Sequence, residues 1–198
     1  MGDTALELVR SVMTSPWLYA LLVVLAVLDA FLPLVPSETA VLLAGTFAAG
    51  QGPDLALVVL AGAAGAVAGD HVAYAVGRGL GSRALARVPA GTRTARAHAW
   101  AAEATARGGG PVLVGARFVP GGRTATTLTM GATGFPLRRF TSYDTVACFL
   151  WAGWCSGVGY AGGRVFAEHP FVGAVAGTVL ALLVGLVATL LHRRSAVR

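Results

Sequence analysis

One segment limits the possible folds of this chain more than any other, because Pro170–Leu191 carries no charge over 22 residues. A helix needs about 20 predominantly apolar residues to cross the hydrocarbon core of a bilayer. Further candidate spans are Trp17–Leu28, Leu55–Val76, which contains Asp70, and Thr145–Tyr160. Only 12% of the 198 residues are charged and the mean hydropathy is +0.70, whereas soluble domains carry about 25% charged residues. The sequence therefore predicts a single all-α transmembrane domain over residues 1–198.

The distribution of arginines predicts how the chain is oriented. Three regions are rich in arginine, namely Arg78–Arg107, the pair Arg138 and Arg139, and the tail after Leu191. Basic loops stay on the cytoplasmic side of a membrane, so these regions and both termini are expected there. The net charge of +6 does not indicate nucleic-acid binding, since the arginines are spread over loops without interleaved aromatic residues.

Two apolar segments are interrupted by proline and glycine. Residues 31–49 are broken by Pro33, Pro36 and Glu38, and residues 111–133 are broken by Pro120, Gly121 and Gly122. Each half is too short to span, which favours two re-entrant hairpins of about 31–49 and about 111–133. Together with about four transmembrane helices, including 170–191, this layout brings the first hairpin in from outside and the second from the cytoplasm.

Short matches between the two broken regions indicate an inverted repeat. The sequence Phe31-Leu32-Pro33 resembles Phe118-Val119-Pro120, and Tyr74–Arg78 at the expected end of the second helix resembles Tyr160–Arg164. Inverted repeats that meet near the bilayer midplane are a common transporter plan. Chance similarity in a Gly/Ala-rich chain is the alternative.

Ionisable residues lie in or beside the broken segments, where each costs about 2.5–3.5 kcal/mol even on the mildest scale. They are Asp29, Glu38, Asp70, Arg117 and Arg123. One interpretation is mutual neutralisation of acids and arginines. The other is a polar cavity for a charged ligand, which we favour because two arginines flank a glycine turn.

The segment Arg117–Arg123 has the chemistry of an anion site. Arginine stays protonated and can hold a phosphate through two parallel hydrogen bonds. The glycines Gly121 and Gly122 allow backbone N–H groups to approach the same anion. The sequence therefore predicts a phosphate site made of Arg117, Arg123, Gly121 and Gly122.

The acids have alternative roles. Glu38 either caps a short helix or binds a proton from the outer face. Asp29 either binds a proton in the same way or lies in water at the interface. Asp70 either pairs with an arginine or lines the cavity, while Gly65 and Gly69 are expected to permit close helix packing. The stretch Arg78–Arg107 is either a helix on the anionic membrane surface or a solvated basic loop.

No metal site or cofactor is predicted. The four histidines are scattered along the chain. Cys148 and Cys155 lie seven residues apart without a metal-binding motif, which favours core packing.

Three motifs together resemble the DedA family of bacterial membrane proteins, also described as VTT-domain or SNARE-associated proteins. They are Pro36-Ser37-Glu38 with a preceding acid, Gly69-Asp70…Tyr74…Gly77-Arg78, and Arg117-Phe-Val-Pro-Gly-Gly-Arg123. The resemblance covers 29–164 and implies two opposed re-entrant hairpins in a multi-pass protein of the inner membrane. It also implies transport of lipid phosphates, notably recycling of undecaprenyl phosphate, with proton coupling in some members. The family's functional positions map onto Asp29, Glu38, Arg117 and Arg123, although many relatives have Glu where this chain has Asp29.

The resulting expectation is a flippase that moves a polyprenyl phosphate from the outer to the inner leaflet. Arg117 and Arg123 would bind the phosphate, and Asp29, Glu38 and Asp70 would bind protons or line the cavity. The expected partners are the polyprenyl-phosphate lipid, membrane phospholipids and protons. A small-ion or proton antiporter and a membrane-homeostasis or assembly factor are the alternatives. An enzyme such as a lipid-phosphate phosphatase is disfavoured, because no histidine nucleophile lies near either arginine in sequence.

Overall fold

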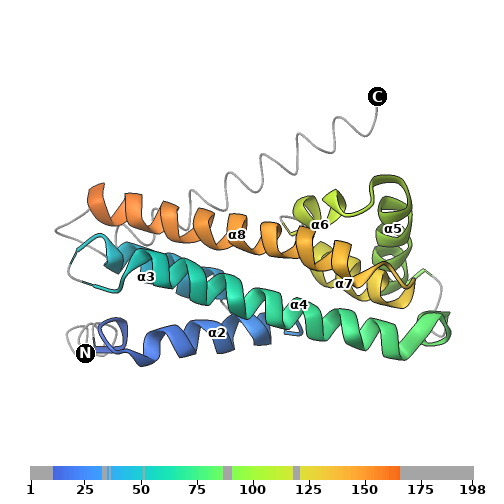
Figure 1. Ribbon diagram of the computed structural model, residues 1–198, viewed down its shortest axis with the longest axis horizontal. Helices are drawn as coiled ribbons and strands as arrows, with labels where there is room; N and C mark the ends of the chain where they lie inside the picture. The colour runs from blue at the N-terminus through green and yellow to red at the C-terminus, as the bar shows by residue number, and fades with distance from the viewer. Residues whose placement is uncertain are drawn as a thin grey trace. The chain divides into compact units, whose positions relative to one another are not determined.

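The computed structural model describes residues 11–32, 35, 37–50, 52–86, 91–117 and 121–165, and every regular element that spans them is a helix (Figure 1). The helices are α2 (Trp17–Asp29), α3 (Ser37–Ala48), α4 (Leu55–Ala86), α5 (Arg93–Gly108), α6 (Pro111–Ala116), α7 (Gly122–Ala132) and α8 (Leu137–Val165). The all-α prediction is thus confirmed for this part of the chain. The predicted helix 170–191 lies outside the described residues, as do Pro33, Pro36 and Phe118–Pro120.

The chain divides into two compact units, and α2, α4 and α8 each contribute to both. The first unit contains α2 up to Leu25, all of α3, the start of α4 up to Ala63 and the end of α8 from Trp151. The second contains the remainder of α2, α4 and α8 together with α5, α6 and α7. Each unit therefore includes the helix that follows the break in one of the two broken segments.

In the first unit, α3 packs against the end of α8 through glycines. A Cβ atom at Gly45 would overlap the backbone of Ser156, and one at Gly159 would overlap the backbone of Leu42. Small residues at such contacts let two helix backbones approach closely. The start of α4 is fixed by Asp54, whose Oδ1 accepts a hydrogen bond from the Leu57 amide at 3.0 Å, as an N-cap residue does.

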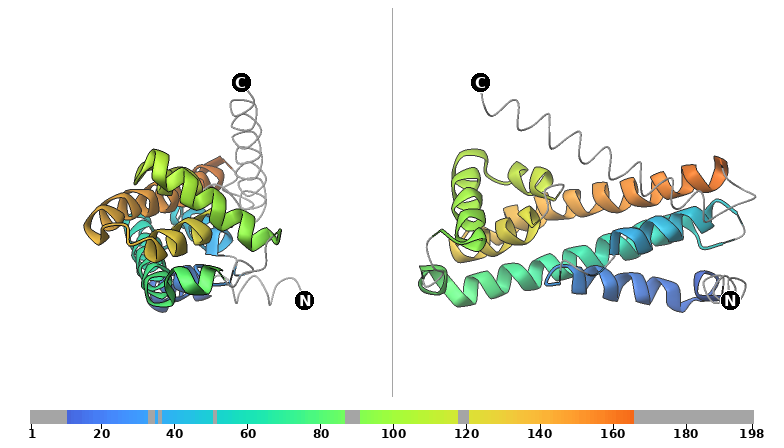
Figure 2. Two further views of the ribbon diagram at one scale, coloured as in Figure 1. Left: turned by 90° about the vertical axis from the view of Figure 1, so that its right-hand side faces the viewer. Right: turned by 180° about the vertical axis from the view of Figure 1, so that it is seen from behind.

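In the second unit, α4 packs against α7 in the same way. A Cβ atom at Gly77 would overlap the backbone of Leu128, and one at Gly131 would overlap the backbone of Tyr74. A small apolar core made of Tyr74, Leu113, Met130 and Phe140 adjoins this contact. Helix α5 lies beside α7 and also contacts α6 (Figure 2).

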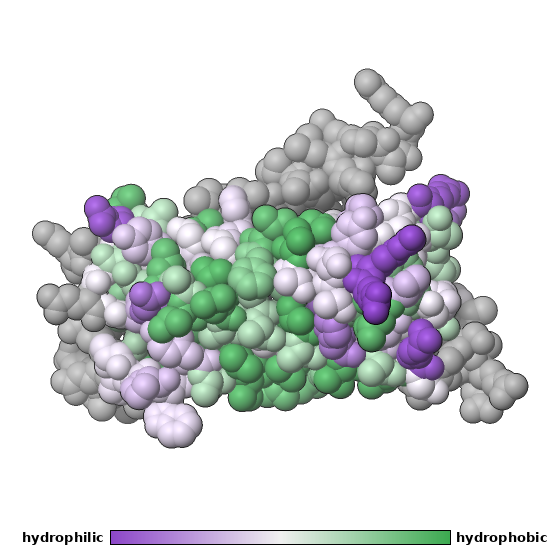
Figure 3. All heavy atoms as spheres, in the orientation of Figure 1, coloured by the Kyte–Doolittle hydropathy of each residue, from purple (hydrophilic) through white to green (hydrophobic). Residues whose placement is uncertain are grey.

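Large apolar side chains are exposed at helical spacing, and Figure 3 shows hydrophobic residues over much of the face in view. On α2 they form a stripe with steps of three or four residues, made of Trp17, Leu21, Val24 and Leu28. On α8 a second stripe lies along one side of the helix, made of Val146, Phe149, Leu150 and Trp154. Soluble monomers rarely expose contiguous apolar patches of this kind. The stripes fit contact with lipid.

Only part of the predicted membrane layout can be compared with the structure. Among the described helices, Leu55–Gly79, with 25 residues, is the one both long and apolar enough to cross a membrane. The apolar helix Trp17–Asp29 has 13 residues, and α8, with 29, is long enough but less apolar. Four spans and two opposed hairpins therefore stay predictions.

The broken segments have different local structures. Residues 111–133 form two short helices, α6 and α7, which contact one another around a break, as the prolines and glycines predicted. In residues 31–49 the described part after the break is the single helix α3. The predicted end of the second helix near Arg78 is wrong, because α4 continues to Ala86. Residues 79–86 contain no proline and include several strong helix formers, so nothing local stops the helix at Arg78.

Candidate functional site

Arg117 and Asp70 form a buried ion pair in the second unit. Arg117 follows the last residue of α6, and its Nη1 donates a hydrogen bond to Asp70 Oδ2 at 2.7 Å. The two side chains are 3% and 1% exposed. This pair joins the end of α6 to α4, and removal of one partner would leave a buried charge with less compensation.

Arg123, in the first turn of α7, reaches the same carboxylate from the other side of the break. Its Nε lies 3.6 Å from Asp70 Oδ1, and its Nη1 lies 3.4 Å from Asp29 Oδ2. Its Nη2 also donates a hydrogen bond to the backbone oxygen of Asp29 at 2.6 Å. Asp70 therefore lies between two guanidinium groups, with one carboxylate oxygen near each.

Gly121, the N-cap residue of α7, has a φ of +72° and precedes the first residue of that helix. L residues with a side chain rarely adopt this left-handed conformation, so glycine suits the position. Gly122 is buried, and the N-terminus of α7 contributes a partial positive charge beside Arg123. The turn thus adds to the positive potential made by the arginines.

Asp144 and Cys148, one turn apart on α8, complete the cluster. Both are buried, and Asp144 Oδ1 lies 4.0 Å from Arg117 Nη1. The Cys148 sulfur lies 3.7 Å from Asp144 Oδ1 and 3.9 Å from Asp70 Oδ2. The sequence analysis did not name Asp144, which directly precedes the candidate span Thr145–Tyr160. The rule that flagged the other charges, applied one residue earlier, would have found it.

The site carries more acids than arginines. Three carboxylates, on Asp29, Asp70 and Asp144, surround the guanidinium groups of Arg117 and Arg123. Ligand atoms of Asp70, Asp144 and Cys148 lie within 4.8 Å of one another, a spacing that a metal ion could use. Arg117 Nη1 already lies beside both carboxylates, however, and a second cation there would be repelled.

The structure brings together four of the residues that the sequence singled out, Asp29, Asp70, Arg117 and Arg123, with Gly121 and Gly122 adjoining them. Of the two roles expected for Asp70, the structure shows the contact with arginines. Glu38 belongs to the first unit, in the first turn of α3, with an exposed side chain. A carboxylate in the first turn stabilises a helix, because it lies near the partial positive charge of the helix N-terminus.

Comparison with known proteins gives matches over most of the chain. Residues 32–161 match the family model described as the VTT domain. The chain is 32% identical to "Inner membrane protein YohD" of Escherichia coli (strain K12) over 142 residues, which cover 68% of each protein. It is 26% identical to "Protein DedA" of the same strain over 193 residues, 92% of this chain and 86% of that protein. No solved structure matches.

These matches fit the exposed apolar stripes and the apolar helix Leu55–Gly79, and they support a membrane location. The family match covers Asp70, Arg117, Arg123 and Asp144, and it begins three residues after Asp29. The chain belongs to the DedA family of VTT-domain membrane proteins.

Proposed function

We propose that the protein is a transporter of a lipid phosphate and not an enzyme. The substrate we favour is a polyprenyl phosphate such as undecaprenyl phosphate, moved from the outer to the inner leaflet. The observation that carries the proposal is the convergence of Arg117 and Arg123 on the single carboxylate of Asp70. Family membership supports a role in membrane transport or homeostasis in general terms.

The geometry favours exchange of one anion for another. Asp70 occupies the space between the guanidinium groups, so neither arginine is a buried charge without a counter-ion. A phosphate monoester presents several oxygens to two donors and matches the planar fork of arginine. It would replace Asp70 on entry, and Asp70 would displace it on release. Such competition keeps binding weak enough for turnover.

A lipid substrate agrees with the surroundings of Asp70. The carboxylates of Asp70 and Asp29 both lie beside Arg123. Phe31 and Leu32 lie just after Asp29 in the chain, and both are exposed apolar side chains. An isoprenoid tail that remained in the bilayer would meet such side chains without losing apolar contact. Only the phosphate would then enter the cluster of arginines.

Protons would set the direction. Moving one charge across 100 mV costs about 2.3 kcal/mol, and the inside-negative potential opposes inward movement of an anion. Uptake of protons by acids such as Asp29 and Glu38 would offset this cost. Inward transport would then depend on the proton gradient.

The test is transport in reconstituted vesicles, followed by the accessibility of polyprenyl phosphate at the outer surface. The pair-deletion variant, Asp70→Leu with Arg117→Met, removes both charges of the buried pair together, because removal of one alone would leave the other uncompensated. The control variant, Arg138→Met with Arg139→Met, removes two exposed arginines from the start of α8. We expect transport to be lost in the first and kept in the second. Equal rates in wild type and the pair-deletion variant would overturn the role of Arg117.

The same vesicles distinguish the antiporter alternative. The cluster of buried acids and arginines would also suit ion exchange without a lipid. If ion gradients change the internal pH equally with and without polyprenyl phosphate, and no lipid moves, the protein is an antiporter.

A further inference from the structure

The structure contains an acid that the exchange of phosphate and Asp70 does not use. Asp144 is 1% exposed, and no hydrogen bond reaches its Oδ2 in the described part of the chain. Its other oxygen faces Arg117 Nη1 at 4.0 Å, but that nitrogen lies much closer to Asp70, at 2.7 Å. Asp144 therefore obtains little compensation from the arginine, and Cys148 Sγ, 3.7 Å from Oδ1, is only a weak hydrogen-bond donor. A buried carboxylate with so little compensation is costly.

A histidine lies next to this oxygen. His71 Nδ1 is 3.5 Å from Asp144 Oδ2 and 2.8 Å from the backbone oxygen of Val67. Both neighbours are acceptors, so Nδ1 carries the hydrogen, and Nε2 accepts a hydrogen bond from Thr141 Oγ1 at 2.8 Å. The edge of the Phe140 ring packs on the imidazole. The ring is thus held with its N–H group beside the acid.

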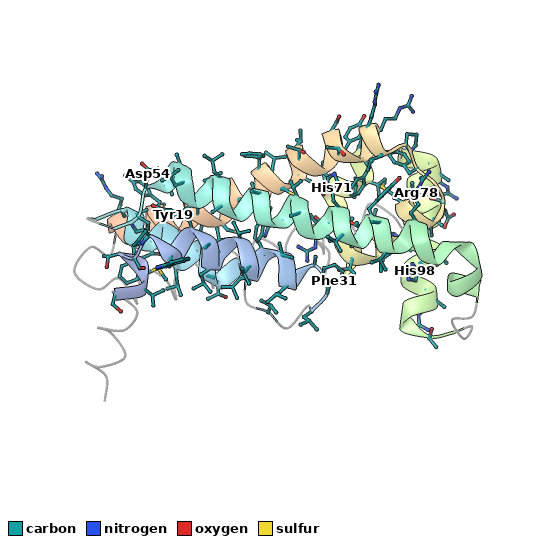
Figure 4. All side chains as sticks on the ribbon, turned by 60° about the horizontal axis from the view of Figure 1, so that its bottom comes forward. Tyr19, Phe31, Asp54, His71, Arg78 and His98 are labelled. Atoms are coloured by element: carbon teal, nitrogen blue, oxygen red, sulfur yellow. The ribbon has the colours of Figure 1, made fainter. Side chains whose placement is uncertain are left out.

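His71 connects the buried acid with the surface. Its side chain is 30% exposed, and it lines a cavity of about 370 Å³ with Tyr74, Ala75, Arg78, Gly79 and Leu137. A water molecule occupies about 30 Å³ in the liquid, so this space admits several. His71 and Arg78 lie two turns apart along α4 (Figure 4). The cavity therefore extends toward the end of α4 that the arginine distribution assigns to the cytoplasm.

We propose that Asp144 and His71 form a proton relay between the arginine site and the cytoplasmic side of the membrane. The Nδ1–H bond breaks as an O–H bond forms on Asp144 Oδ2. In place of the hydrogen bond from Thr141, Nε2 takes a proton from a hydronium ion in the cavity, which becomes water. The reverse sequence releases the proton of Asp144 to that water. After proton transfer in either direction, the imidazole ring of His71 is neutral and carries one N–H hydrogen.

The relay rests on the proposed function, because it explains how charge is balanced when phosphate enters. The groups that face Asp144 are Asp70 and His71 from α4, Arg117 from the end of α6, and Cys148 on its own helix. When phosphate displaces Asp70 from the arginines, an additional negative charge lies beside Asp144. A proton on Asp144 removes one of these negative charges. After the phosphate has been released, His71 returns the proton to the cytoplasm.

A first measurement does not depend on transport. Infrared difference spectra of the purified protein, recorded across a pH titration, report the C=O stretch of a protonated carboxyl group. We expect a band that titrates in wild type, is lost in Asp144→Asn and is kept in Asp54→Asn, which alters an exposed acid at the start of α4. A wild-type spectrum without such a band, or a band unchanged in Asp144→Asn, overturns the proposal.

A second measurement uses transport in vesicles. Truncation of His71 to Ala should slow transport by about tenfold or more, since positioned proton transfer contributes at least that factor. Imidazole should restore the rate, because it can enter the cavity left by the side chain, whereas the weaker base pyrazole should not. The control is His98→Ala, which truncates another half-buried histidine, hydrogen-bonded to Thr129, and should not respond to imidazole.

The outcomes separate the two proposals. If the infrared band behaves as expected but wild-type protein moves no polyprenyl phosphate, the relay stands and the proposed substrate is wrong. If lipid moves but His71→Ala transports at the wild-type rate with the wild-type pH profile, the relay is wrong and the transport function stands.

Discussion

Two arginine–carboxylate pairs in the second unit differ in their surroundings, and so in what they contribute to stability. Arg117 and Asp70 are almost completely buried, whereas Arg107 and Glu103 on α5 are 79% and 61% exposed. Exposed pairs of this type on a helix contribute about 0.3–0.5 kcal/mol. Breaking a buried pair costs about 3–5 kcal/mol, because the remaining charge stays buried.

We therefore predict that Asp70→Asn lowers the free energy of unfolding by several kcal/mol, about 3–5 by this comparison. The measurement is chemical or thermal unfolding of the purified protein in detergent. Glu103→Gln is the matched control and should change stability by less than about 0.5 kcal/mol. Similar unfolding midpoints for the two variants would show that Asp70 and Arg117 are not paired in the folded protein.

A second prediction concerns pH. His98 lies on α5, outside the predicted spans, and burial lowers its pKa below the usual 6.5. The folded state then binds fewer protons than the unfolded state, so this histidine opposes folding increasingly as the pH falls through about 6.5. We expect wild type to lose stability relative to His98→Gln below that pH and to match its pH dependence above it. A stability difference that stays constant between pH 5 and pH 8 would contradict this.

At the residue scale, the sequence predicted most of the residues that meet but not how they pair. The cost of charges in apolar segments singled out Asp29, Glu38, Asp70, Arg117 and Arg123, of which Glu38 belongs to the first unit and the others to the second. The pairing of those others depends on contacts across large sequence separations, such as the separation of 47 positions from Asp70 to Arg117, which no local pattern encodes. The contacts of His71 with Thr141 and Asp144 were not predictable for the same reason.

At the scale of elements, the two units use the same kind of contact. Helix α3 packs on α8 through Gly45 and Gly159, and α7 packs on α4 through Gly131 and Gly77. In each case, the helix after the break in one segment packs on the long helix that comes after the other segment. Thus α3 of residues 31–49 packs on α8, and α7 of residues 111–133 packs on α4. This reciprocity is what an internal repeat would produce, and it adds a structural argument to the short sequence matches.

The third prediction follows from this packing. Gly77→Ala would place a Cβ atom against the backbone of Leu128, whereas Gly79→Ala meets nothing within 4 Å. We expect the first to destabilise the protein by about 1–3 kcal/mol. The second should be neutral or stabilising by up to about 1 kcal/mol, because alanine favours helix more than glycine does. Unfolding in detergent measures both, and equal effects would mean that α4 and α7 are not in close contact.

The helices themselves were largely predictable, but their relation to the bilayer was not. Apolar runs and the Pro/Gly breaks located α2, α4 and the pair α6 and α7. The predicted end of α4 at Tyr74–Arg78 is wrong, because strong helix formers follow Arg78 and the helix continues to Ala86. Whether the broken segments re-enter the membrane depends on the surrounding lipid, which local sequence patterns do not specify.

At the scale of the whole molecule, the charge asymmetry predicts topology. The apolar helix Leu55–Gly79 separates residues near Gly50 from α5. We predict that Ala106→Cys reacts with a membrane-impermeant maleimide only from the cytoplasmic side and Gly50→Cys only from the outside. Both positions are exposed, and the native cysteines, Cys148 and Cys155, are buried, so the background should be low. The reagent reaches only the outer side in intact cells and both sides in opened cells. Labelling of both cysteines in intact cells, or of both only after the cells are opened, would refute this topology.

The most direct measurement is equilibrium binding of a polyprenyl phosphate to the purified protein, compared with the matching polyprenol that lacks the phosphate. If the arginines on either side of the break hold the phosphate, wild type binds the phosphate form far more tightly. The pair-deletion variant should then bind both forms equally weakly, and Arg138→Met with Arg139→Met should behave like wild type. Equal affinity of wild type for the two lipids, or unchanged phosphate preference in the pair-deletion variant, would contradict a phosphate site at Arg117 and Asp70.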